Sequence, residues 1–242
     1  MRNIVFELCA ETIDACLAAR DGGAARIELC SGLSEGGLTP SHALICAAIE
    51  HSGLPVHVLI RPRGGDFLYR EHELSVMRDD VAHAKSLGAS GVVLGILAPD
   101  GTVDIPTTRS LVELAYPMKV TFHRAFDVTP SLSAALEDVI ATGCDRILTS
   151  GGQRNVVAGT QTLSQLVVQA GSRIDIAVGG GLRLQNAPSL SRLTVAAHFH
   201  GSLRRRLLPK AGRAAGDGAM KSSRNVVAAD DIRTVIRRLQ NT

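Results

Sequence analysis

The sequence of 242 residues contains no tryptophan, and aromatic residues make up only 3% of it. Proteins that bind single-stranded nucleic acid need aromatic faces on which bases can stack, so this composition argues against a nucleic-acid partner. No apolar run reaches the roughly 18 residues that cross a bilayer. The N-terminal stretch "MRNIVFELCAET" turns acidic without a cleavage-site pattern. We therefore expect no membrane span and no signal peptide.

The cysteines are five in number, and their spacing fits no disulfide framework. Free thiols in a reducing compartment are the ordinary state of such residues, so we predict a cytoplasmic protein. We expect Cys16, Cys46 and Cys144 to be small core residues. For Cys9 and Cys30, a core position and a functional role are equally compatible with the sequence.

The net charge is only +3, but basic residues are concentrated near the C-terminus, where twelve Lys and Arg stand against three Asp from Arg183 onward. A basic tail can indicate nucleic-acid binding. A solvated loop next to an anion site explains the same charge without requiring aromatic residues. We predict a mobile loop over residues 204–224, after the eighth strand.

Strand-like apolar runs alternate with helix-like stretches along the whole chain, with about 30 residues per unit, the size of a βα repeat. We predict strands at residues 3–9, 25–30, 55–61, 91–97, 118–123, 145–150, 173–179 and 194–201. We predict helices that include residues 12–19, 40–51, 70–87, 130–141 and 230–239.

Glycines stand on both sides of the apolar runs in "GAARIELCSG", "GASGVVLG" and "GCDRILTSGG", where a helix would end before the run and where the strand itself would end after it. The apolar runs between them are nearly continuous, as in parallel strands covered on both faces. We therefore predict an α/β protein of a single domain over residues 1–242, a TIM-type (β/α)₈ barrel. A doubly wound open sheet is the alternative, although no G-x-G-x-x-G follows the first strand.

The tripeptide Glu-Leu-Cys ends each of the first two predicted strands, as Glu7–Cys9 and Glu28–Cys30. Because side chains alternate across a strand, the acid and the thiol of each pair share one face. A carboxylate inside an apolar barrel needs a partner, and Arg61 and His123 are candidates. We expect Cys9 and Cys30 to lie at equal height on neighbouring strands.

Further candidate site residues stand at or after the ends of the other predicted strands, on the face where barrels of this kind place their active sites. They are Arg61, Arg63 and Asp66 after the third strand, His123 and Arg124 after the fifth, Gly179, Gly180 and Gly181 after the seventh, and His200 and Ser202 at the eighth. Loops after strands seven and eight commonly bind phosphate, and arginine recognises phosphate or carboxylate.

The strings "RIELCSGLSEGGLTPS", "IRPRGGDFLY", "VTFHRAFD", "RILTSGG", "GGG" and "FHGS" resemble the CutC family, named for copper homeostasis, over most of the chain. The resemblance implies a cytoplasmic TIM-type barrel that forms a homodimer or higher oligomer and binds Cu(I) through cysteines. The matching positions are Cys9 and Cys30. Leu203 and the arginines that follow it depart from the family pattern.

Two hypotheses follow; the close family resemblance favours the first, copper homeostasis, and the set of polar residues keeps the second as the alternative. In the first, the two thiolates hold soft Cu(I). In the second, the chain is an enzyme of lyase, isomerase or aldolase type acting on a small phosphorylated or carboxylated metabolite. Glu28 or Glu7 would then accept a proton, with His123 as the partner acid.

In the enzyme hypothesis Arg61 and Arg63 would hold the charge of the substrate, and Gly180, Gly181 and Ser202 would hold a phosphate. Asp66 belongs to the same acid/base set. No lysine stands at the functional end of a strand, which disfavours a Schiff base. A metallohydrolase that uses glutamates, His123 and His200 is a third option, although no short metal motif supports it.

Overall fold

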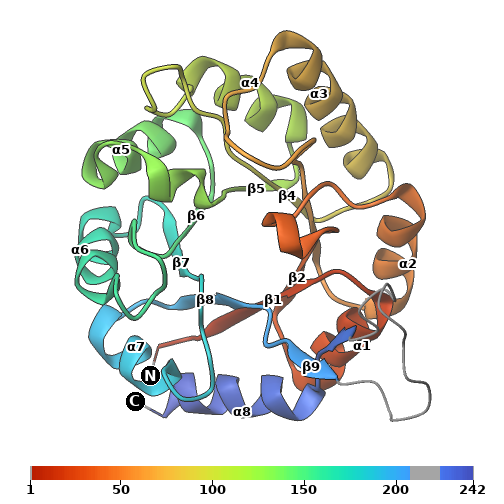
Figure 1. The fold of residues 1–242 in the computed structure, drawn as a ribbon, viewed down its shortest axis with the longest axis vertical. Helices are drawn as coiled ribbons and strands as arrows, with labels where there is room; N and C mark the ends of the chain where they lie inside the picture. Colours follow the sequence, from red (N-terminus) through yellow and green to blue (C-terminus); the bar gives the residue numbers. More distant parts are fainter. Residues whose placement is uncertain (1, 208–223, 242) are drawn as a thin grey trace, which may run out of the picture.

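A computed structural model describes residues 2–207 and 224–241, and its eight parallel strands close into a barrel in chain order (Figure 1). The strands are β1 (Val5–Ala10), β2 (Arg26–Leu29), β3 (Val56–Leu59), β4 (Gly91–Leu94), β5 (Lys119–Phe122), β6 (Arg146–Thr149), β7 (Asp175–Val178) and β8 (His198–Gly201). Since β1 pairs with both β2 and β8, the sheet has no edge, which confirms the predicted barrel and excludes the open sheet.

Helices surround the barrel on the outside (Figure 1). They are α1 (Ile13–Gly22), α2 (His42–Ser52), α3 (Glu71–Ser86), α4 (Ile105–Ala115), α5 (Leu132–Thr142), α6 (Thr160–Ala170), α7 (Ala187–Thr194) and α8 (Ala229–Gln240), with short 3₁₀ turns η1 (Leu33–Glu35) and η2 (Arg124–Val128). Thr12, Ser41 and Ser131 begin helices by accepting a backbone N–H, and Gly23 and Gly143 end helices in the left-handed conformation.

Alternation along the strands divides the interior into two parts. Outward residues such as Phe6, Leu8 and Ile27 pack under the helices in one large apolar core. Inside the barrel lies a small apolar cluster of Cys9, Cys30, Leu59 and Val93 together with many polar side chains. The barrel interior is therefore unusually polar for a packed core.

Glycines on the strands make room for histidine rings inside the barrel. A Cβ on Gly91 would lie 2.6 Å from the His57 ring, and one on Gly95 would lie 2.3 Å from Nδ1 of His123. At these two positions the missing side chain allows an imidazole to occupy the barrel interior.

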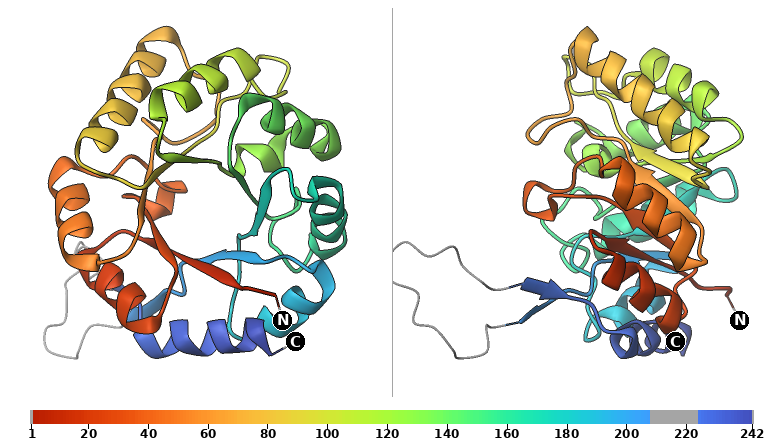
Figure 2. Two further views of the ribbon diagram at one scale, coloured as in Figure 1. Left: turned by 180° about the vertical axis from the view of Figure 1, so that it is seen from behind. Right: turned by 90° about the vertical axis from the view of Figure 1, so that its right-hand side faces the viewer.

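The segment predicted as a loop begins and ends in an antiparallel ribbon of β9 (Arg205–Leu207) and β10 (Arg224–Val226), which projects from the barrel (Figure 2). Residues 208–223, and with them the prediction of a mobile loop, lie outside the described residues. None of the helices within the described ranges is long and apolar enough to cross a membrane.

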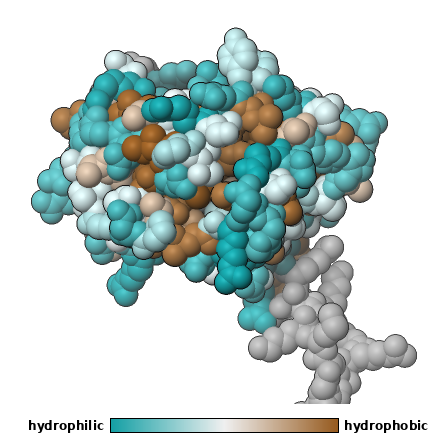
Figure 3. All heavy atoms as spheres, turned by 90° about the horizontal axis from the view of Figure 1, so that it is seen from above, coloured by the Kyte–Doolittle hydropathy of each residue, from teal (hydrophilic) through white to brown (hydrophobic). Residues whose placement is uncertain are grey.

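Large apolar side chains that remain exposed, among them Tyr116 and Val168, come from different parts of the chain. On the face shown in Figure 3, hydrophobic residues lie among hydrophilic ones. The oligomer expected from the family resemblance stays a prediction.

Candidate functional site

A cavity of about 500 Å³ opens at the C-terminal ends of the strands. It collects residues that are far apart in the sequence, from β1, β2 and β8 and from the segments that follow β3, β5 and β7. Most of the predicted site residues line it: Cys9, Glu28, Arg61, His123, Arg124, Gly180, Gly181, His200 and Ser202. The strand ends thus meet at one site, as the barrel topology requires.

Glu7 does not line the cavity but lies below it, fully buried inside the barrel. Its carboxylate forms an ion pair with Arg146, lies 3.4 Å from Nε of Arg26 and accepts a 2.8 Å hydrogen bond from Nδ1 of His200. Burial alone would raise the pKa of Glu7, but Arg146 and His200 outweigh it and hold that pKa well below its usual range. Glu7 is therefore ionised and fully occupied by its partners.

Cys9, Glu28 and His200 form a buried group directly above Glu7, with one ligand atom of each within 4.8 Å of the others. The Cys9 thiol donates to Oε1 of Glu28 at 3.5 Å, while Oε2 of Glu28 has no hydrogen-bond partner among the described residues. Burial raises the pKa of Glu28, partly offset by His200. The carboxylates of Glu28 and Glu7 outweigh desolvation at His200 and raise its pKa.

Cys9 and Cys30 are close in space, but the prediction that they lie at equal height on neighbouring strands is wrong. The register pairs Cys9 with Glu28, so Cys30 lies two residues further along its strand. Their Sγ atoms are nevertheless 3.7 Å apart, and Cys30 is buried behind the cavity wall. The contact with Cys30, burial and the Glu28 carboxylate together raise the pKa of the Cys9 thiol well above its usual value.

The other cysteines follow the predicted core role in two cases of three. Cys16 and Cys144 are buried, and burial raises the pKa of these thiols to about 11 and about 12. Cys46 is only half-buried, on α2, where Sγ lies 3.5 Å from Nε2 of His42. The prediction of a core position is therefore wrong for Cys46.

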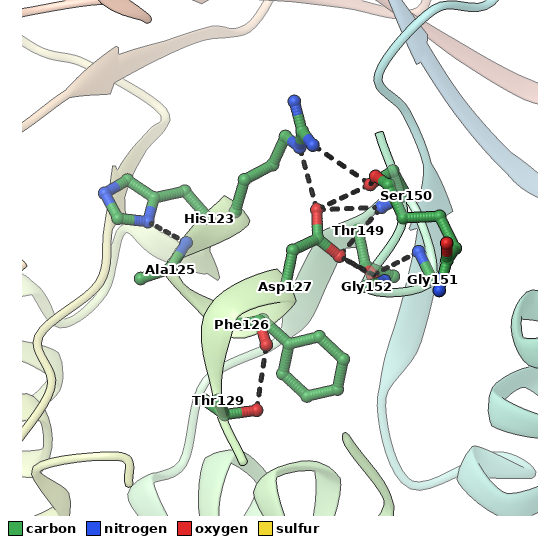
Figure 4. A network of polar contacts seen from close by, with 11 residues as sticks. His123, Ala125, Phe126, Asp127, Thr129, Thr149, Ser150, Gly151 and Gly152 are labelled. Atoms are coloured by element: carbon green, nitrogen blue, oxygen red, sulfur yellow. Dashed lines mark hydrogen bonds and ion pairs between the residues drawn. The ribbon is translucent and has the colours of Figure 1, made fainter. Parts of the chain in front are cut away.

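His123 lines the cavity, and its two ring nitrogens differ in their partners. Its Nδ1 accepts the backbone N–H of Ala125 at 3.1 Å, so the neutral ring carries its proton on Nε2 (Figure 4). Nε2 is buried and has no partner among the described residues. Desolvation, with a contribution from Arg61, lowers the pKa of His123 to about 3. The ring is therefore a neutral hydrogen-bond donor at physiological pH.

The arginines after β3 make their contacts with the protein itself. Arg61 donates to the backbone oxygens of Glu35, Gly37 and Gly65 at 2.8–2.9 Å, so it ties two loops together instead of pairing with a glutamate. Arg63 pairs with Asp66 at 3.0 Å and also with Glu73, outside the cavity.

Gly179 is packed into the cavity wall. A Cβ on this residue would lie 2.5 Å from Leu148 and 3.0 Å from Cβ of His200. Its role in the structure is to let these side chains approach.

The carboxylate of Asp127 joins the turn after β5 to the loop after β6 (Figure 4). It accepts hydrogen bonds from the hydroxyls of Thr149 and Ser150 and from the backbone N–H groups of Ser150 and Gly152. It also pairs with Nε of Arg124 at 2.8 Å. The string "TFHRAFD" contains this acid, but no local sequence pattern points to its partners at the end of β6 and in the loop that follows.

Arg183 and Arg204 also line the cavity and were not among the predicted site residues. Among the described residues, the lining contains four arginines but only two carboxylates, those of Glu28 and Asp127. This excess of arginine makes the cavity favourable for an anionic ligand.

The fold and the cavity define the class of protein: a TIM-type barrel with an arginine-rich cavity at the C-terminal ends of its strands. The chain belongs to the CutC family, whose sequence profile matches residues 4–205. The match ends where β9 begins.

Curated relatives described as family protein CutC include one from Xanthomonas campestris pv. campestris (strain 8004), 48% identical over 199 residues, which are 82% of this chain and 83% of the relative. Another, from Chromobacterium violaceum, is 46% identical over 200 residues, 83% of this chain and 81% of the relative.

Among solved structures, the putative copper homeostasis protein CutC from Streptococcus agalactiae is 33% identical, with a TM-score of 0.78 over 82% of this chain and 98% of that one. N-(5'-phosphoribosyl)anthranilate isomerase from Pyrococcus furiosus is similar in fold alone. It is 12% identical, with a TM-score of 0.59 over 99% of this chain and 100% of that one.

Proposed function

We propose that this protein is an enzyme that moves a proton on a small anionic metabolite bound in the rim cavity. The observation that carries this proposal is a pair of unpartnered polar atoms, Oε2 of Glu28 and Nε2 of His123, which are buried and belong to residues lining one cavity. A buried polar group without a partner is costly, and a bound substrate would supply the missing hydrogen bonds.

Glu28 is the proton acceptor in this proposal. Its pKa is raised by burial, which brings a carboxylate closer to the pH at which it exchanges protons efficiently. The His200 imidazolium, which is anchored by Glu7, stabilises the ionised form of Glu28 between turnovers. Glu7 acts by holding His200, not by touching the substrate.

His123 is the hydrogen-bond donor in this proposal. Because Nδ1 is occupied by the Ala125 N–H, Nε2–H is the one ring donor left for a ligand bound in the cavity that His123 lines. A neutral imidazole in this position would polarise a carbonyl oxygen and stabilise the negative charge that develops when a neighbouring carbon loses its proton. This assignment replaces the role of partner acid that the sequence suggested.

No lysine lines the cavity among the described residues, and Lys119 pairs with Asp145 at the opposite end of the barrel strands. The reaction class that fits is therefore proton abstraction next to a carbonyl without a Schiff base, as in isomerases, lyases and aldolases that form no imine.

The test is a screen of phosphorylated and carboxylated hydroxy and keto compounds in D₂O, with exchange of the carbon-bound hydrogen followed by ¹H NMR. Glu28→Gln should reduce exchange by about 10²-fold or more, since this is the usual contribution of a positioned base. Glu137→Gln, which changes an exposed glutamate on α5, is the matched control and should exchange like the wild type. Exchange by Glu28→Gln at the wild-type rate would remove Glu28 from the mechanism.

Cu(I) binding is the second candidate, and a separate observation favours it. The Cys9 and Cys30 sulfurs are 3.7 Å apart in a buried pair, and two thiolates suit a soft ion of low coordination number. His200 and Glu28 lie beside Cys9 and could complete the site. Because the pKa of the Cys9 thiol is raised, Cu(I) would have to displace protons, so affinity should increase with pH.

Competition titrations of the reduced protein with Cu(I) and a chelator test this candidate. A variant with Cys9→Ser and Cys30→Ser should lose the site, whereas Cys144→Ser, which removes a buried thiol outside the cavity, should keep it. Equal Cu(I) affinity of the wild type and the double variant would rule the thiolate site out.

A further inference from the structure

We propose that the segments after β7 and β8 form a phosphate subsite, so that the substrate of the proposed enzyme is a phosphate monoester. This inference rests on the proposed function and names its substrate class. It assigns the anion to a different set of groups from the arginines after β3, which are already engaged by the protein itself.

Backbone N–H groups supply most of the donors. Four of these N–H groups make no hydrogen bond to another described residue: those of Gly180, Gly181 and Leu182 after β7, and that of Ser202 after β8. All four residues line the cavity. Consecutive unpaired amides at the end of a strand form a concave site for an anion.

The neighbouring carbonyls fix the direction of two of these amides. The carbonyl of Gly180 accepts the N–H of Val156 at 2.9 Å, and that of Gly181 accepts the side-chain amide of Asn186 at 2.9 Å. In a planar trans peptide the N–H points opposite to the carbonyl, so the Gly181 and Leu182 N–H groups point away from these partners. Gly180 and Gly181 reach this geometry at φ of 102° and 94°, which only glycine adopts readily.

Arg124 supplies a fixed positive charge beside these amides. Its Nε donates to Asp127 at 2.8 Å, and Nη2 donates to the hydroxyl of Ser150 at 3.0 Å. The guanidinium lies against Gly180, since a Cβ there would be 3.2 Å from Cζ of Arg124. Nη1 is left without a partner among the described residues, so one nitrogen of a guanidinium that is held in place by its other two nitrogens is available to a ligand.

The number and arrangement of donors favour phosphate over carboxylate. Four amides, the Ser202 hydroxyl and the Arg124 fork can surround the three terminal oxygens of a phosphate monoester, whereas a carboxylate offers only two oxygens. Arg183, which lines the same end of the cavity and donates to the carbonyl of Leu182, adds charge without filling the space.

The experiment is isothermal titration calorimetry at low ionic strength, with glycerol 3-phosphate, inorganic phosphate and lactate as probes. Wild-type protein should bind glycerol 3-phosphate at one saturable site and lactate at least about tenfold more weakly. Arg124→Gln should weaken glycerol 3-phosphate binding by about tenfold or more, because a charge-assisted hydrogen bond is lost. Ser202→Ala should weaken it by a smaller factor.

Arg192→Gln is the matched control, because Arg192 is an exposed arginine on α7 that does not line the cavity. It should bind like the wild type. Equal affinity of Arg124→Gln and the wild type, or equal binding of lactate and glycerol 3-phosphate, would overturn the subsite.

Glu28→Gln separates this inference from the proposed function. It should bind glycerol 3-phosphate as the wild type does and yet lose hydrogen exchange on the substrate. Normal exchange with intact phosphate binding would refute the role of Glu28 and leave the subsite standing. Absent phosphate binding in a protein whose exchange depends on Glu28 would refute the subsite alone.

Discussion

The carboxylate of Glu7 holds the polar interior of the barrel together, and Glu7→Gln tests that role. In the wild type this carboxylate faces Arg146, Arg26 and His200, and it is fully buried. The glutamine keeps the shape but removes the charge. The two guanidinium groups would then remain buried near a neutral amide, next to a histidine that has lost its anionic partner.

The expected loss of stability at pH 7 is about 3–5 kcal/mol, the usual effect of removing one member of a buried ion pair. For a domain of this size, 1 kcal/mol corresponds to about 2–4 °C, so the melting temperature should fall by roughly 6–20 °C. Urea unfolding followed by circular dichroism measures the free energy of unfolding directly. Glu137→Gln, which breaks the exposed pair with Arg173, should leave the midpoint almost unchanged.

The pH dependence gives a second readout. Glu7 has a pKa well below its usual range in the folded state, so the unfolded chain binds its proton at higher pH. The stability that the charge contributes is therefore complete above the unfolded pKa of about 4.3 and is lost as pH falls below it. The difference in the free energy of unfolding between the wild type and Glu7→Gln should become smaller below about pH 4. A loss of less than about 1 kcal/mol at pH 7 would refute the view that Glu7 organises this interior.

Three further predictions concern the histidine, the glycine beside it and the thiols. Gly95→Ala should destabilise the protein by about 1–3 kcal/mol in urea unfolding and displace the His123 ring, because the new Cβ would lie 2.3 Å from Nδ1 of His123. Gly64→Ala is the control, since its Cβ would meet nothing closer than 3.5 Å. Equal stability of the two variants would contradict the argument. Because the pKa of His123 is about 3, its ¹⁵N signals should remain those of a neutral ring protonated on Nε2 from pH 8 down to pH 5; titration near pH 6.5 would show that the ring is not desolvated. Of the five thiols, that of half-buried Cys46 should react first with Ellman's reagent at pH 8, and Cys46→Ser should abolish the fast phase; a fast phase that persists would mean that one of the buried thiols is accessible.

Much of the fold could be predicted because its signals are local. Each strand is a short apolar run, several of these runs are flanked by glycine, and all eight predicted strands are present, with observed bounds mostly a few residues shorter. At several strands the apolar run continues into a flanking segment that is not part of the strand, and the strand predicted at 194–201 starts at the last residue of α7. Residues 59–61, for example, pass from β3 to the buried Arg61 without a break in burial.

The site could be predicted only as a set of residue types at strand ends. The sequence shows Glu7 and Glu28 in the same tripeptide, yet one lies beneath the cavity and the other lines it. Arg146, the main partner of Glu7, is 139 residues away in the chain, and no local pattern connects the two. Asp127 was visible in its motif, but its role depends on Ser150 and Gly152 in the loop after the next strand, β6.

The sequence by itself determined that this protein is a closed barrel of βα repeats with acids, thiols, histidines and arginines at the ends of its strands, because burial pattern and glycine position act over a few residues. The tertiary structure alone decided which of these groups meet. Closing a barrel tilts and staggers its strands, so residues in equivalent places of two repeats come to lie at different heights. That stagger sets Cys9 beside Glu28, leaves Glu7 below them, and turns two identical tripeptides into parts with different chemistry.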